Sequence, residues 1–569
     1  MSSLEKRWRF KQIDHEASDK LCDSLRIHPV ICDMLSNRGI SSFEEAKDFF
    51  RPSLKQLHDP FLMKDMRIAT DRIMRAIRTN EKILIYGDYD VDGTTAVSVV
   101  FDFLQFIYPS KCIEYYIPDR YKEGYGLSSA GIDYAEKNNF NLLITLDCGI
   151  KSVELIQLAK EKQIDCIVCD HHLPGNQLPP AVAILNPKQP NCSYPFKELC
   201  GCGVGFKLIQ ALCMELELDE TLYTKYLDLV ATAIAADIVS ITDENRTLAF
   251  FGLKKANENP NTGIRALIEQ SNLKTPLSVN SLSFAIGPRI NAAGRMGDAK
   301  RAVSLFIEKD IIKAKEIALT LQSENNNRKE ADSSITDEAL MQITQDDTAH
   351  LKKTIVVYNE HWHKGVLGIV ASRLLEKYYK PTIVLTKSGD FYTGSARSIA
   401  GFNMYEGLDK CSHLLHAFGG HYFAAGMTIV PSQIELFKET FETVANSMLS
   451  TDDMVPEIEI DAEIQLKDIH HSFYHILEQM EPFGPDNTKP VFCVRNVTNV
   501  GCRIVKDDHL RFEVMQDNFS INGIGFQLAE KYEKLAHPIK MDIVFTIEEN
   551  HFNGRTTLQM KVIDFNRAK

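Results

Sequence analysis

Residues 83–93 read Ile-Leu-Ile-Tyr-Gly-Asp-Tyr-Asp-Val-Asp-Gly, and this stretch decides the fold class predicted for the first half of the chain. Its apolar run, Ile83–Tyr86, ends at Gly87 and is followed by three carboxylates. Similar apolar runs occupy residues 142–146 and 166–169. Short apolar runs separated by polar helical stretches are typical of buried parallel strands, so we predict an α/β domain with a parallel sheet.

Acidic residues mark the ends of these runs. Asp88, Asp147 and Asp170 each come within two residues of the end of a run, where the chain turns toward the next helix. The carboxyl ends of parallel strands form the ligand crevice of an open sheet. Asp90-Val-Asp92 and His171-His172 add further ligands beside them. Because so many carboxylates would repel one another without a cation, we predict a metal site, and oxygen-rich ligands favour Mg²⁺ or Mn²⁺ over zinc.

Two other interpretations of these acids compete with a catalytic metal site. The run Asp88–Gly93 imitates the start of a calcium-binding EF-hand loop, but position twelve of that loop requires glutamate and is Val99 here. The run also follows a strand instead of a helix, which excludes the calcium interpretation. Each acid alone could be a helix cap or a solvated turn residue, but their joint placement at three strand ends argues against this.

The second half of the chain changes character twice. Residues 301–343 are helical and polar in pattern, which predicts a long connector, and an α/β segment follows with strands at 354–358 and 381–385 and a helix at 368–378. Beyond residue 451 apolar residues alternate with polar ones, and Asn553-Gly554 supplies a hairpin turn. We therefore predict a small all-β domain, a barrel, at the C-terminal end.

Bulk composition narrows the class of protein. The first residues lack the apolar stretch of a secretory signal, and no apolar run approaches the length of a membrane span. A cytoplasmic location without membrane contact is therefore expected. The net charge of −13 argues against a protein that coats nucleic acid, but not against a nuclease with one basic channel. The 13 cysteines are scattered, and Cys200-Gly-Cys202 lacks a second pair at zinc-ligand spacing.

The motifs resemble those of the DHH phosphoesterase superfamily. Residues 88–93, Leu146-Asp-Cys148, Asp170-His-His172 and Ala236-Asp237 match its four motifs in order. Further matches indicate the bacterial RecJ branch, the single-strand-specific 5′→3′ exodeoxyribonucleases. They are Glu123–Leu127, Gly201–Gly205, Glu244–Arg246, Pro288–Arg295, Trp362–Val366, Gly368–Arg373, Gly394–Ser398 and Gly419–His421. The chain departs from the pattern after Asp237, where relatives often have Val-Val-Pro and this chain has Ile-Val-Ser.

The resemblance implies a domain order that agrees with the patterns. A parallel-sheet DHH domain is expected at 61–300 after an N-terminal segment at 1–60. A helical connector at 301–345 then leads to an α/β DHHA1 domain at 346–450 and an OB-type barrel at 451–569. The barrel would add a second nucleic-acid surface.

The resemblance also implies two metal ions and a role for each ligand. Asp88, Asp90 and Asp147 would hold one ion, and Asp92, His171, Asp237 and the bridging Asp147 the other. Asp170 would orient a histidine beside the metals. His172 would face the scissile phosphate and stabilise charge or donate a proton. Two such ions can activate water and stabilise the charged phosphate.

Substrate contacts are predicted from groups that could hold phosphates. Arg289, Asn291 and Arg295 lie in a Gly/Ala-rich segment predicted as a loop that permits close backbone approach. Ser395 and Arg397 are candidates for a 5′-phosphate pocket, with Arg120 assisting, and Gly419-Gly420-His421 is a predicted turn that would grip phosphates. Neighbouring tyrosines could stack on unpaired bases, although we expect at least half of them to pack in the core: Tyr121, Tyr125, Tyr392 and Tyr422.

Two competing functions remain. A DHH enzyme for small substrates, such as an oligoribonuclease, a cyclic-dinucleotide phosphodiesterase or a pyrophosphatase, is typically shorter and lacks the barrel. An inactive DHH scaffold that binds DNA would have lost metal ligands, whereas every motif position is filled here. The expected function is therefore a metal-dependent 5′→3′ exonuclease on single-stranded DNA, in repair and recombination. By resemblance, its partners would be a single-strand-binding protein and a helicase, and the chain would be a monomer.

Overall fold

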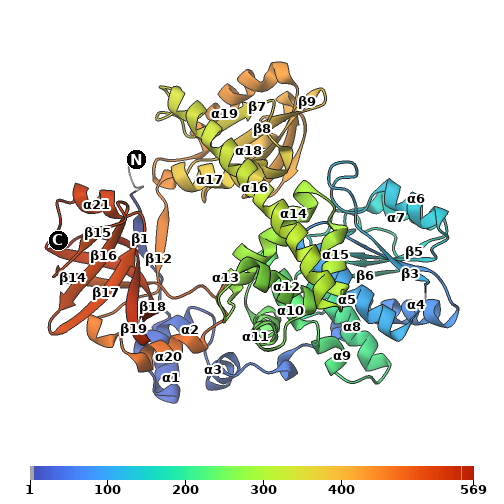
Figure 1. Cartoon of the computed structure of the whole chain (residues 1–569), viewed down its shortest axis with the longest axis horizontal. Coiled ribbons are helices and arrows are strands. Elements are labelled where there is room, and N and C mark those ends of the chain that lie inside the picture. The colour runs from blue at the N-terminus through green and yellow to red at the C-terminus, as the bar shows by residue number, and fades with distance from the viewer. Residues whose placement is uncertain (1–4, 110, 553, 569) are drawn as a thin grey trace. The chain divides into compact units, whose positions relative to one another are not determined.

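The computed structural model describes residues 5–109, 111–552 and 554–568, and these divide into two compact units. One unit holds residues 48–327 together with 480–488. The other holds the chain before residue 48, residues 328–479 and the chain after residue 488. Figure 1 labels many of the elements of both units.

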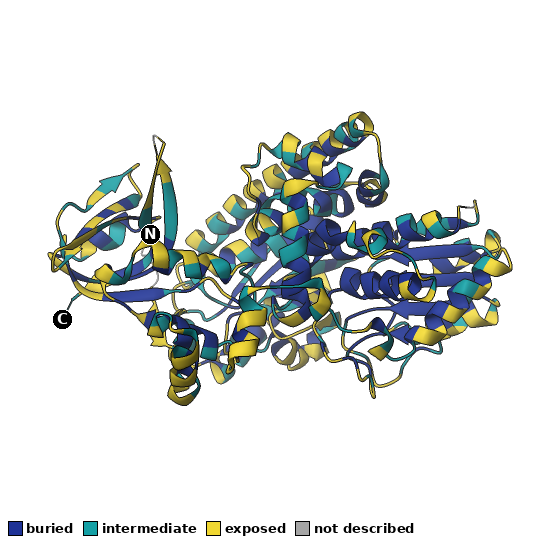
Figure 2. Cartoon of the chain, turned by 90° about the horizontal axis from the view of Figure 1, so that it is seen from below, coloured by how far each residue is buried: buried dark blue, intermediate teal, exposed yellow. Residues whose placement is uncertain are grey.

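The first unit is built on a five-stranded parallel sheet in the order β3-β2-β4-β5-β6. Alternate residues of β2 enter two different cores: Ile83 and Ile85 face one, and Leu84 and Tyr86 the other. Both faces are therefore covered by helices, and the central strands are dark blue in Figure 2. The strands are β2 (Ile83–Gly87), β3 (Ile113–Tyr116), β4 (Leu142–Leu146), β5 (Asp165–Cys169) and β6 (Ala183–Leu185).

Helices on one face of the sheet form most of this unit. Helix α5 begins at the Asp90 cap, whose carboxylate accepts a hydrogen bond from the Gly93 amide at 3.0 Å, and it packs against α8, α10 and α15. The helices of this unit are α4 (Met66–Arg78), α5 (Val91–Ile107), α6 (Ser129–Lys137), α7 (Val153–Glu161), α8 (Gly201–Glu215), α9 (Thr221–Thr224), α10 (Leu227–Asp237), α11 (Asp243–Glu258), α12 (Thr262–Ser271), α13 (Val279–Ser281), the π-helical η3 (Leu282–Ile286), α14 (Gly287–Met296) and α15 (Lys300–Ile307).

The long connecting helix is α16 (Ile311–Gln345), and a mixed sheet in the order β10-β11-β9-β8-β7 follows it. Only the β7–β8 pair of this sheet is parallel. The predicted strands and helix of this region are confirmed within two or three residues at their ends. The elements are β7 (Ile355–Asn359), α17 (Leu367–Tyr378), β8 (Thr382–Ser388), β9 (Phe391–Arg397), α18 (Met404–Asp409), β10 (Leu415–Gly420), β11 (Ala424–Ile429) and α19 (Ile434–Met448).

The predicted barrel is confirmed. Five strands pair in the ring β14-β18-β19-β17-β16, and the β14–β16 pairing closes it. A helix, α21, stands between the third and fourth strands of the ring in chain order. The hairpin residue Asn553 lies outside the described residues, and its neighbour Gly554 has φ +73°. The elements are β13 (Ala462–Glu463), α20 (His471–Gln479), β14 (Phe492–Asn499), β15 (Arg503–Val505), β16 (His509–Gln516), β17 (Phe519–Gly525), α21 (Ala529–Lys534), β18 (Lys540–Phe552) and β19 (Arg555–Arg567).

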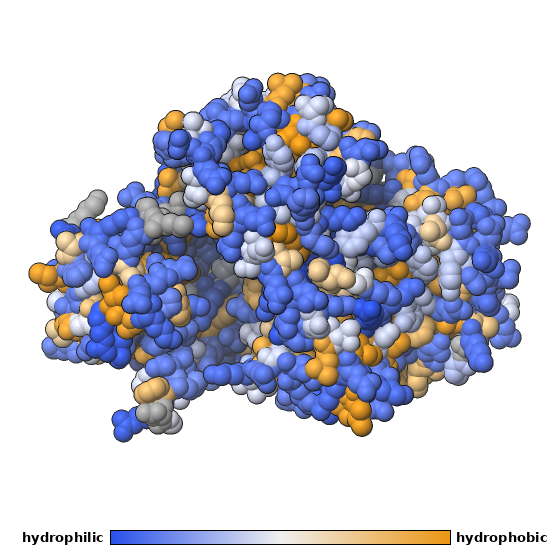
Figure 3. Space-filling view, turned by 45° about the horizontal axis from the view of Figure 1, so that its top comes forward, coloured by the Kyte–Doolittle hydropathy of each residue, from blue (hydrophilic) through white to orange (hydrophobic). Residues whose placement is uncertain are grey.

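The N-terminal segment joins the barrel region, which the sequence patterns did not predict. Strand β1 (Arg7–Phe10) pairs in parallel with β12 (Glu457–Ile460), and the Trp8 indole donates to Asp564 at 2.9 Å. Helices α1 (His15–Leu25), α2 (Pro29–Ser36) and α3 (Phe43–Phe50) follow. Among the described helices, none is both long and apolar enough to cross a membrane. Hydrophilic residues predominate on the face shown in Figure 3.

Candidate metal centre

Three strand ends deliver the predicted acids to one edge of the parallel sheet. Asp88 follows β2, Asp147 follows β4 and Asp170 follows β5, and these strands are neighbours. All three carboxylates are at most 2% exposed. Asp147 has a left-handed backbone (φ +59°), which turns the chain sharply at the strand end. The strand-end pattern therefore correctly predicted that Asp88 and Asp170, which are 82 positions apart, lie at the same edge of the sheet.

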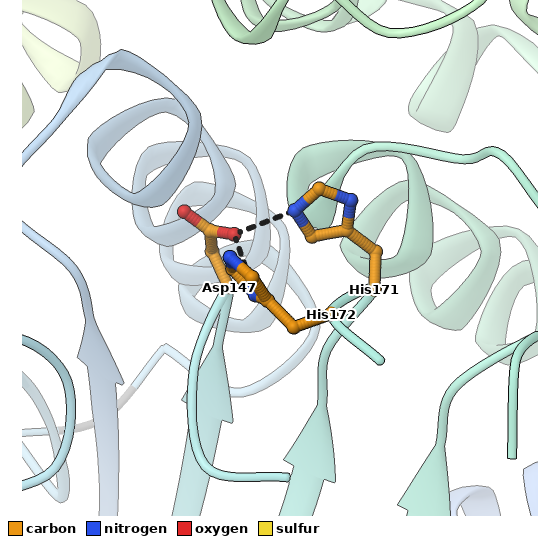
Figure 4. Close-up of side chains that lie close together, drawn as sticks. All are labelled: Asp147, His171 and His172. Atoms are coloured by element: carbon orange, nitrogen blue, oxygen red, sulfur yellow. Dashed lines mark ion pairs between the residues drawn. The ribbon is translucent and has the colours of Figure 1, made fainter. Parts of the chain in front are cut away.

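The predicted metal ligands form groups of the size that holds an ion. One oxygen each of Asp88, Asp90 and Asp147 lies within 4.8 Å of the others, and so do ligand atoms of Asp92, His171 and Asp237. His171 links the two groups, because its Nε2 atom is 3.2 Å from Asp147 Oδ1 and 3.6 Å from Asp237 Oδ2. Figure 4 shows both histidine rings directed toward the Asp147 carboxylate.

Backbone amides fix one of these ligands in place. Asp92 accepts hydrogen bonds from the Gly201 amide at 2.6 Å and the Cys202 amide at 2.7 Å, both at the start of α8. Residue 201 must be glycine, since a Cβ there would lie 2.5 Å from the Cβ of Asp147. Residues 201–205 were matched to a family motif, but no role was predicted for Gly201. A glycine at the start of a helix was the feature from which the hydrogen bond to the Asp92 carboxylate could have been predicted.

The charges of the site are not balanced by the protein itself. Burial, together with the charges of Asp92 and Asp90, raises the pKa of Asp147 well above its usual value. Burial and the charge of Asp90 raise the pKa of Asp88 in the same way. Burial and the neighbouring carboxylates raise the pKa of Asp237 to about 9. Cations are therefore required if these carboxylates are to be ionised at neutral pH.

Several buried atoms of the site point to the same conclusion. Asp88 Oδ2, Asp147 Oδ1 and both ring nitrogens of His171 have no hydrogen-bond partner among the described residues. Burial lowers the pKa of His171, so its ring is held in the neutral form that binds metals. Buried polar atoms without hydrogen bonds are costly unless a ligand satisfies them. The residues thus fit a pair of divalent cations bound by oxygen and imidazole.

His172 is arranged differently from His171. Its Nδ1 atom is 2.8 Å from Asp170 Oδ1, and Asp170 also accepts hydrogen bonds from the amides of Ile150, His171 and His172. Burial opposes ionisation of Asp170, but these hydrogen bonds lower its pKa on balance; burial likewise opposes the charged form of His172, while Asp170 raises the pKa of the imidazole. The Tyr125 hydroxyl lies 3.1 Å from Nε2 of His172. This partly exposed ring is therefore held by Asp170 and stays open to a substrate.

Three predicted substrate residues occupy a helix, so the predicted loop was wrong: Arg289, Asn291 and Arg295. Residues 287–296 form α14, because Pro288 suits a first helical turn and Ala292-Ala293 favour helix and are buried. Position 294 of this helix needs glycine, because a Cβ there would lie 2.8 Å from the Tyr89 carbonyl oxygen. Asn291 accepts a hydrogen bond from the Val91 amide at 3.1 Å, so it supports the metal-binding turn itself.

Of the predicted arginines, Arg120 lies beside this turn, and Arg289 and Arg295 belong to α14. Arg289 donates to the side chain of Gln322 at 2.7 Å and also to the Ala285 carbonyl. The Tyr121 hydroxyl donates to the Arg295 carbonyl. Arg120 stacks on the Tyr89 ring at 4.8 Å. Arg120, Gly294 and Tyr89 also line a cavity of about 210 Å³.

In the second unit, Ser395 and Arg397 come together at the start of α17. Arg397 Nη1 donates to Ser395 Oγ at 3.1 Å, and burial lowers the pKa of the guanidinium. A Cβ on Gly368, in the first turn of α17, would lie 2.7 Å from Arg397 and 3.0 Å from Ser395 Oγ. The Arg397 guanidinium, the Ser395 hydroxyl and the first turn of α17 thus meet at Gly368, which has no side chain. This combination suits a phosphate.

The Gly419-Gly420-His421 segment ends a strand and is not itself the predicted turn. Gly419 and Gly420 are the last residues of β10, and the His421 amide donates to the Ala424 carbonyl at 2.8 Å to close the hairpin. The two glycines belong to the strand because they pair with β11: Gly419 opposes Gly426, and Gly420 opposes Ala425. His421 is exposed, as are Tyr422 and Tyr125, whereas Tyr392 is 5% exposed and packs in the core.

Known proteins match the chain along its length. The profile of the DHH family N-terminal domain matches residues 82–234, that of the DHHA1 domain residues 351–447 and that of the RecJ OB domain residues 460–564. The single-stranded-DNA-specific exonuclease RecJ of Bacillus subtilis is 37% identical over 99% of this chain and 71% of its own length. This chain belongs to the RecJ family. The RecJ exonuclease of Escherichia coli is 30% identical over 94% of this chain and 95% of its own length.

Solved RecJ structures have the same fold. RecJ of Thermus thermophilus in complex with Mn²⁺ matches with a TM-score of 0.86 and 25% identity, covering 99% of this chain and 80% of that one. An exonuclease RecJ bound to manganese matches with a TM-score of 0.60 and 30% identity over 69% of this chain and 96% of that one. The sheet, connecting helix, second α/β domain and barrel are therefore the RecJ architecture.

Proposed function

We propose that this chain is a metal-dependent exonuclease that degrades single-stranded DNA from its 5′ end. The observation that carries the proposal is the meeting of two ligand groups, Asp88/Asp90/Asp147 and Asp92/His171/Asp237, around buried atoms that lack partners among the described residues. Family membership supports the substrate class, because the relatives are single-strand-specific DNA exonucleases by name. The metal would be Mg²⁺ or Mn²⁺, and the 5′ polarity comes from the resemblance alone.

The residues of the site divide the chemistry among them. When bound, two divalent ions would activate a water molecule and stabilise charge on the phosphate oxygens. Asp170 holds the His172 ring through a 2.8 Å contact and so fixes the direction of its other nitrogen. His172 then stabilises charge on the scissile phosphate or donates a proton to the leaving oxygen. Tyr125, 54% exposed beside His172, offers an aromatic face to a terminal base.

We assign recognition of the 5′-phosphate to the second unit. Ser395, Arg397 and the first turn of α17 around Gly368 provide hydrogen-bond donors, as a phosphate requires. His421 follows the two glycines of an exposed strand end, which suits contact with the DNA backbone. Arg120, Arg289 and Arg295 are assigned to phosphates near the metal centre.

The barrel carries a row of cations that supports a second DNA surface. Arg503 is the direct cross-strand partner of Arg511, Arg511 that of Ile524, and Ile524 that of Lys561. The three basic side chains are exposed, and none of them has an ion-pair or hydrogen-bond partner in the part of the chain that is described. Like charges placed directly opposite are destabilising, so a polyanion is the expected counter-charge. Phe526, at the end of β17, is 54% exposed and can stack on a base.

The competing functions are less well supported. A phosphodiesterase for dinucleotides has no use for a barrel with a basic row, and an inactive scaffold has no use for two complete ligand groups. We place the enzyme in the cytoplasm, which agrees with 13 free cysteines. A single-strand-binding protein and a helicase are proposed as partners from the resemblance, to be tested by co-purification, and a monomer is proposed as the oligomeric state.

End-labelled single strands with and without a 5′-phosphate test the proposal. Digestion in Mg²⁺ and in Mn²⁺ should release mononucleotides from the 5′ end of long single strands and leave duplexes intact. Asp170→Ala should lose most of this activity. Faster turnover of dinucleotides than of long strands would replace the proposal by the small-substrate alternative. Wild-type activity in Asp170→Ala would refute the assigned site.

A further inference from the structure

A short segment from the C-terminal part of the chain belongs to the unit that holds the metal ligands. Residues 480–488 lie between α20 and β14, which both belong to the other unit. The segment forms a compact turn in which Gly484 and Asn487 exchange backbone hydrogen bonds of 3.0 and 3.2 Å. The buried Asn487 side chain donates to the carbonyls of Met480 at 3.0 Å and Pro482 at 2.9 Å. We call residues 480–488 the inserted turn.

The inserted turn docks on the loop that follows a proposed metal ligand. The Ile241 amide donates to the Pro485 carbonyl at 2.8 Å, and Gly484 packs so closely that a Cβ would lie 2.5 Å from Ile241 Cγ1. Ile241 is fully buried. A second anchor is Arg246, which donates to the Glu481 carbonyl at 2.9 Å and lies over the Phe49 ring at 3.8 Å.

The loop that follows Asp237, residues 238–242, contains a residue with a strained backbone. Ile238 has φ +59° and ψ +34°, a left-handed conformation that costs a β-branched residue about 1–2 kcal/mol, and its side chain is 64% exposed. No packing of its own side chain explains this conformation. Strained backbone persists where the surroundings fix it from both sides. On one side is α10, and on the other are Asn245, which donates to the Ser240 carbonyl at 2.9 Å, and the inserted turn.

We propose that the inserted turn is a positioning element of the metal centre, which acts by holding the Ile238–Thr242 loop and thereby the direction of the Asp237 carboxylate. Asp237 is the last residue of α10, so the path of the loop that follows it determines the direction of its carboxylate. Its Oδ2 atom is 3.6 Å from His171 Nε2. The inference rests on the proposed function in one respect, namely that Asp92, His171 and Asp237 hold an ion.

The two ligand groups should respond differently when the inserted turn is disturbed. Asp88, Asp90 and Asp147 come from strand ends and the start of α5, and no hydrogen bond between described residues links any of them to the Ile238–Thr242 loop. Only the ion held by Asp237 should therefore weaken. Outer supports of metal ligands typically change affinity by about 10–100-fold.

The test compares Gly484→Ala with Asp486→Asn in the full-length chain. Gly484→Ala places a methyl group against Ile241, while Asp486 is exposed and its left-handed backbone (φ +60°) suits asparagine, so this variant is the control within the same turn. Mn²⁺ binding is measured by calorimetry without DNA. Gly484→Ala should weaken one of two Mn²⁺ sites about tenfold and lower kcat with little change in KM. Asp486→Asn should match wild type.

A compensating variant separates positioning from general destabilisation. Ile241→Ala removes the Cγ1 atom that the new methyl group would meet, so Gly484→Ala/Ile241→Ala should recover Mn²⁺ affinity relative to Gly484→Ala. If Gly484→Ala fails to fold by circular dichroism, Arg246→Lys takes its place and must show the same selective loss.

The outcomes decide the inference separately from the proposed function. Wild-type binding of both Mn²⁺ ions by Gly484→Ala, or an equal loss at both sites in a folded variant, would overturn the inference and leave the exonuclease proposal intact. A wild-type chain that binds no Mn²⁺ and cleaves no single-stranded DNA would instead overturn the proposed function.

Discussion

Nε2 of His171 lies 3.2 Å from Oδ1 of Asp147, and no hydrogen bond among the described residues satisfies either atom. The two side chains follow adjacent parallel strands; they share a ligand group with His172, and each also belongs to a further group, Asp147 with Asp88 and Asp90, and His171 with Asp92 and Asp237. Asp147 is therefore a member of the Asp88/Asp90 group and also lies 3.2 Å from a ligand atom of the Asp92/Asp237 group. A carboxylate in this place can bridge two ions.

Metal should stabilise the fold through this carboxylate. In wild type, Mn²⁺ at about 100 times its Kd should raise the free energy of unfolding by about 2.7 kcal/mol. Burial raises the pKa of the Asp147 carboxyl, so without metal the folded chain must either protonate this group or bear a buried charge; Asp147→Asn is neutral without that cost and in EDTA should unfold at or above the wild-type temperature. With Mn²⁺ the order should reverse, and nuclease activity should fall more than about 100-fold. Thermal melts in EDTA and in Mn²⁺ check this, and a wild-type melting temperature that ignores Mn²⁺ would contradict it.

Asp170 should matter for the reaction more than for metal binding. Asp170→Asn replaces one acceptor oxygen by an NH2 group, so the side chain can no longer accept both from the Ile150 amide and from the His172 ring with its neighbouring amides. We expect kcat to fall about 10–100-fold while Mn²⁺ affinity stays within a few-fold of wild type. The double variant Asp170→Asn/His172→Ala should be no slower than His172→Ala alone, since both changes remove one function. Independent, multiplying losses would show that Asp170 acts by another route.

The first half of the site was predictable because its geometry is local. A strand end followed by an acid places a carboxylate at the sheet edge whatever the rest of the fold does, so Asp88, Asp147 and Asp170 could be grouped from the sequence. Asp237 stands at a helix end, and only the family motif indicated it.

Pairings over long separations were not predictable. Strand β1 pairs with β12 across 450 positions, and the inserted turn reaches Ile241 from position 485. Neither segment carries a pattern that names its partner. Asn291 was predicted to contact substrate from a Gly/Ala-rich loop and from the family resemblance; its hydrogen bond with the Val91 amide, formed from a helix, was not predictable from either.

The phosphate assignment at Arg397 predicts a loss of end preference. Arg397→Met removes the guanidinium, and Gly368→Ala fills the space beside it with a methyl group. Both should reduce the preference for 5′-phosphorylated over 5′-hydroxyl strands, by about 10–100-fold for Arg397→Met, since a hydrogen bond to a charged group contributes about 1.5–3 kcal/mol. The rate on 5′-hydroxyl strands serves as the internal control and should change little. An unchanged ratio in both variants would place the 5′-phosphate elsewhere.

The cation row of the barrel predicts a defect confined to long strands. Arg511→Gln removes the central charge of the Arg503–Arg511–Lys561 row without disturbing the buried side of β16, whose inward residues are Leu510, Phe512 and Val514. Affinity for a long single strand should fall, and the slope of log K against log salt should become shallower by about 0.7 for each phosphate that the row no longer neutralises. The barrel itself should be as stable or slightly more stable, because Arg503 no longer faces a like charge directly opposite.

Glu513→Gln, on the same outward face of β16, is the matched control, and removal of its negative charge should not weaken binding. Hydrolysis of strands too short to reach the barrel should be unchanged in both variants. If Arg511→Gln leaves the salt dependence of long-strand binding at its wild-type value, DNA does not run along this row.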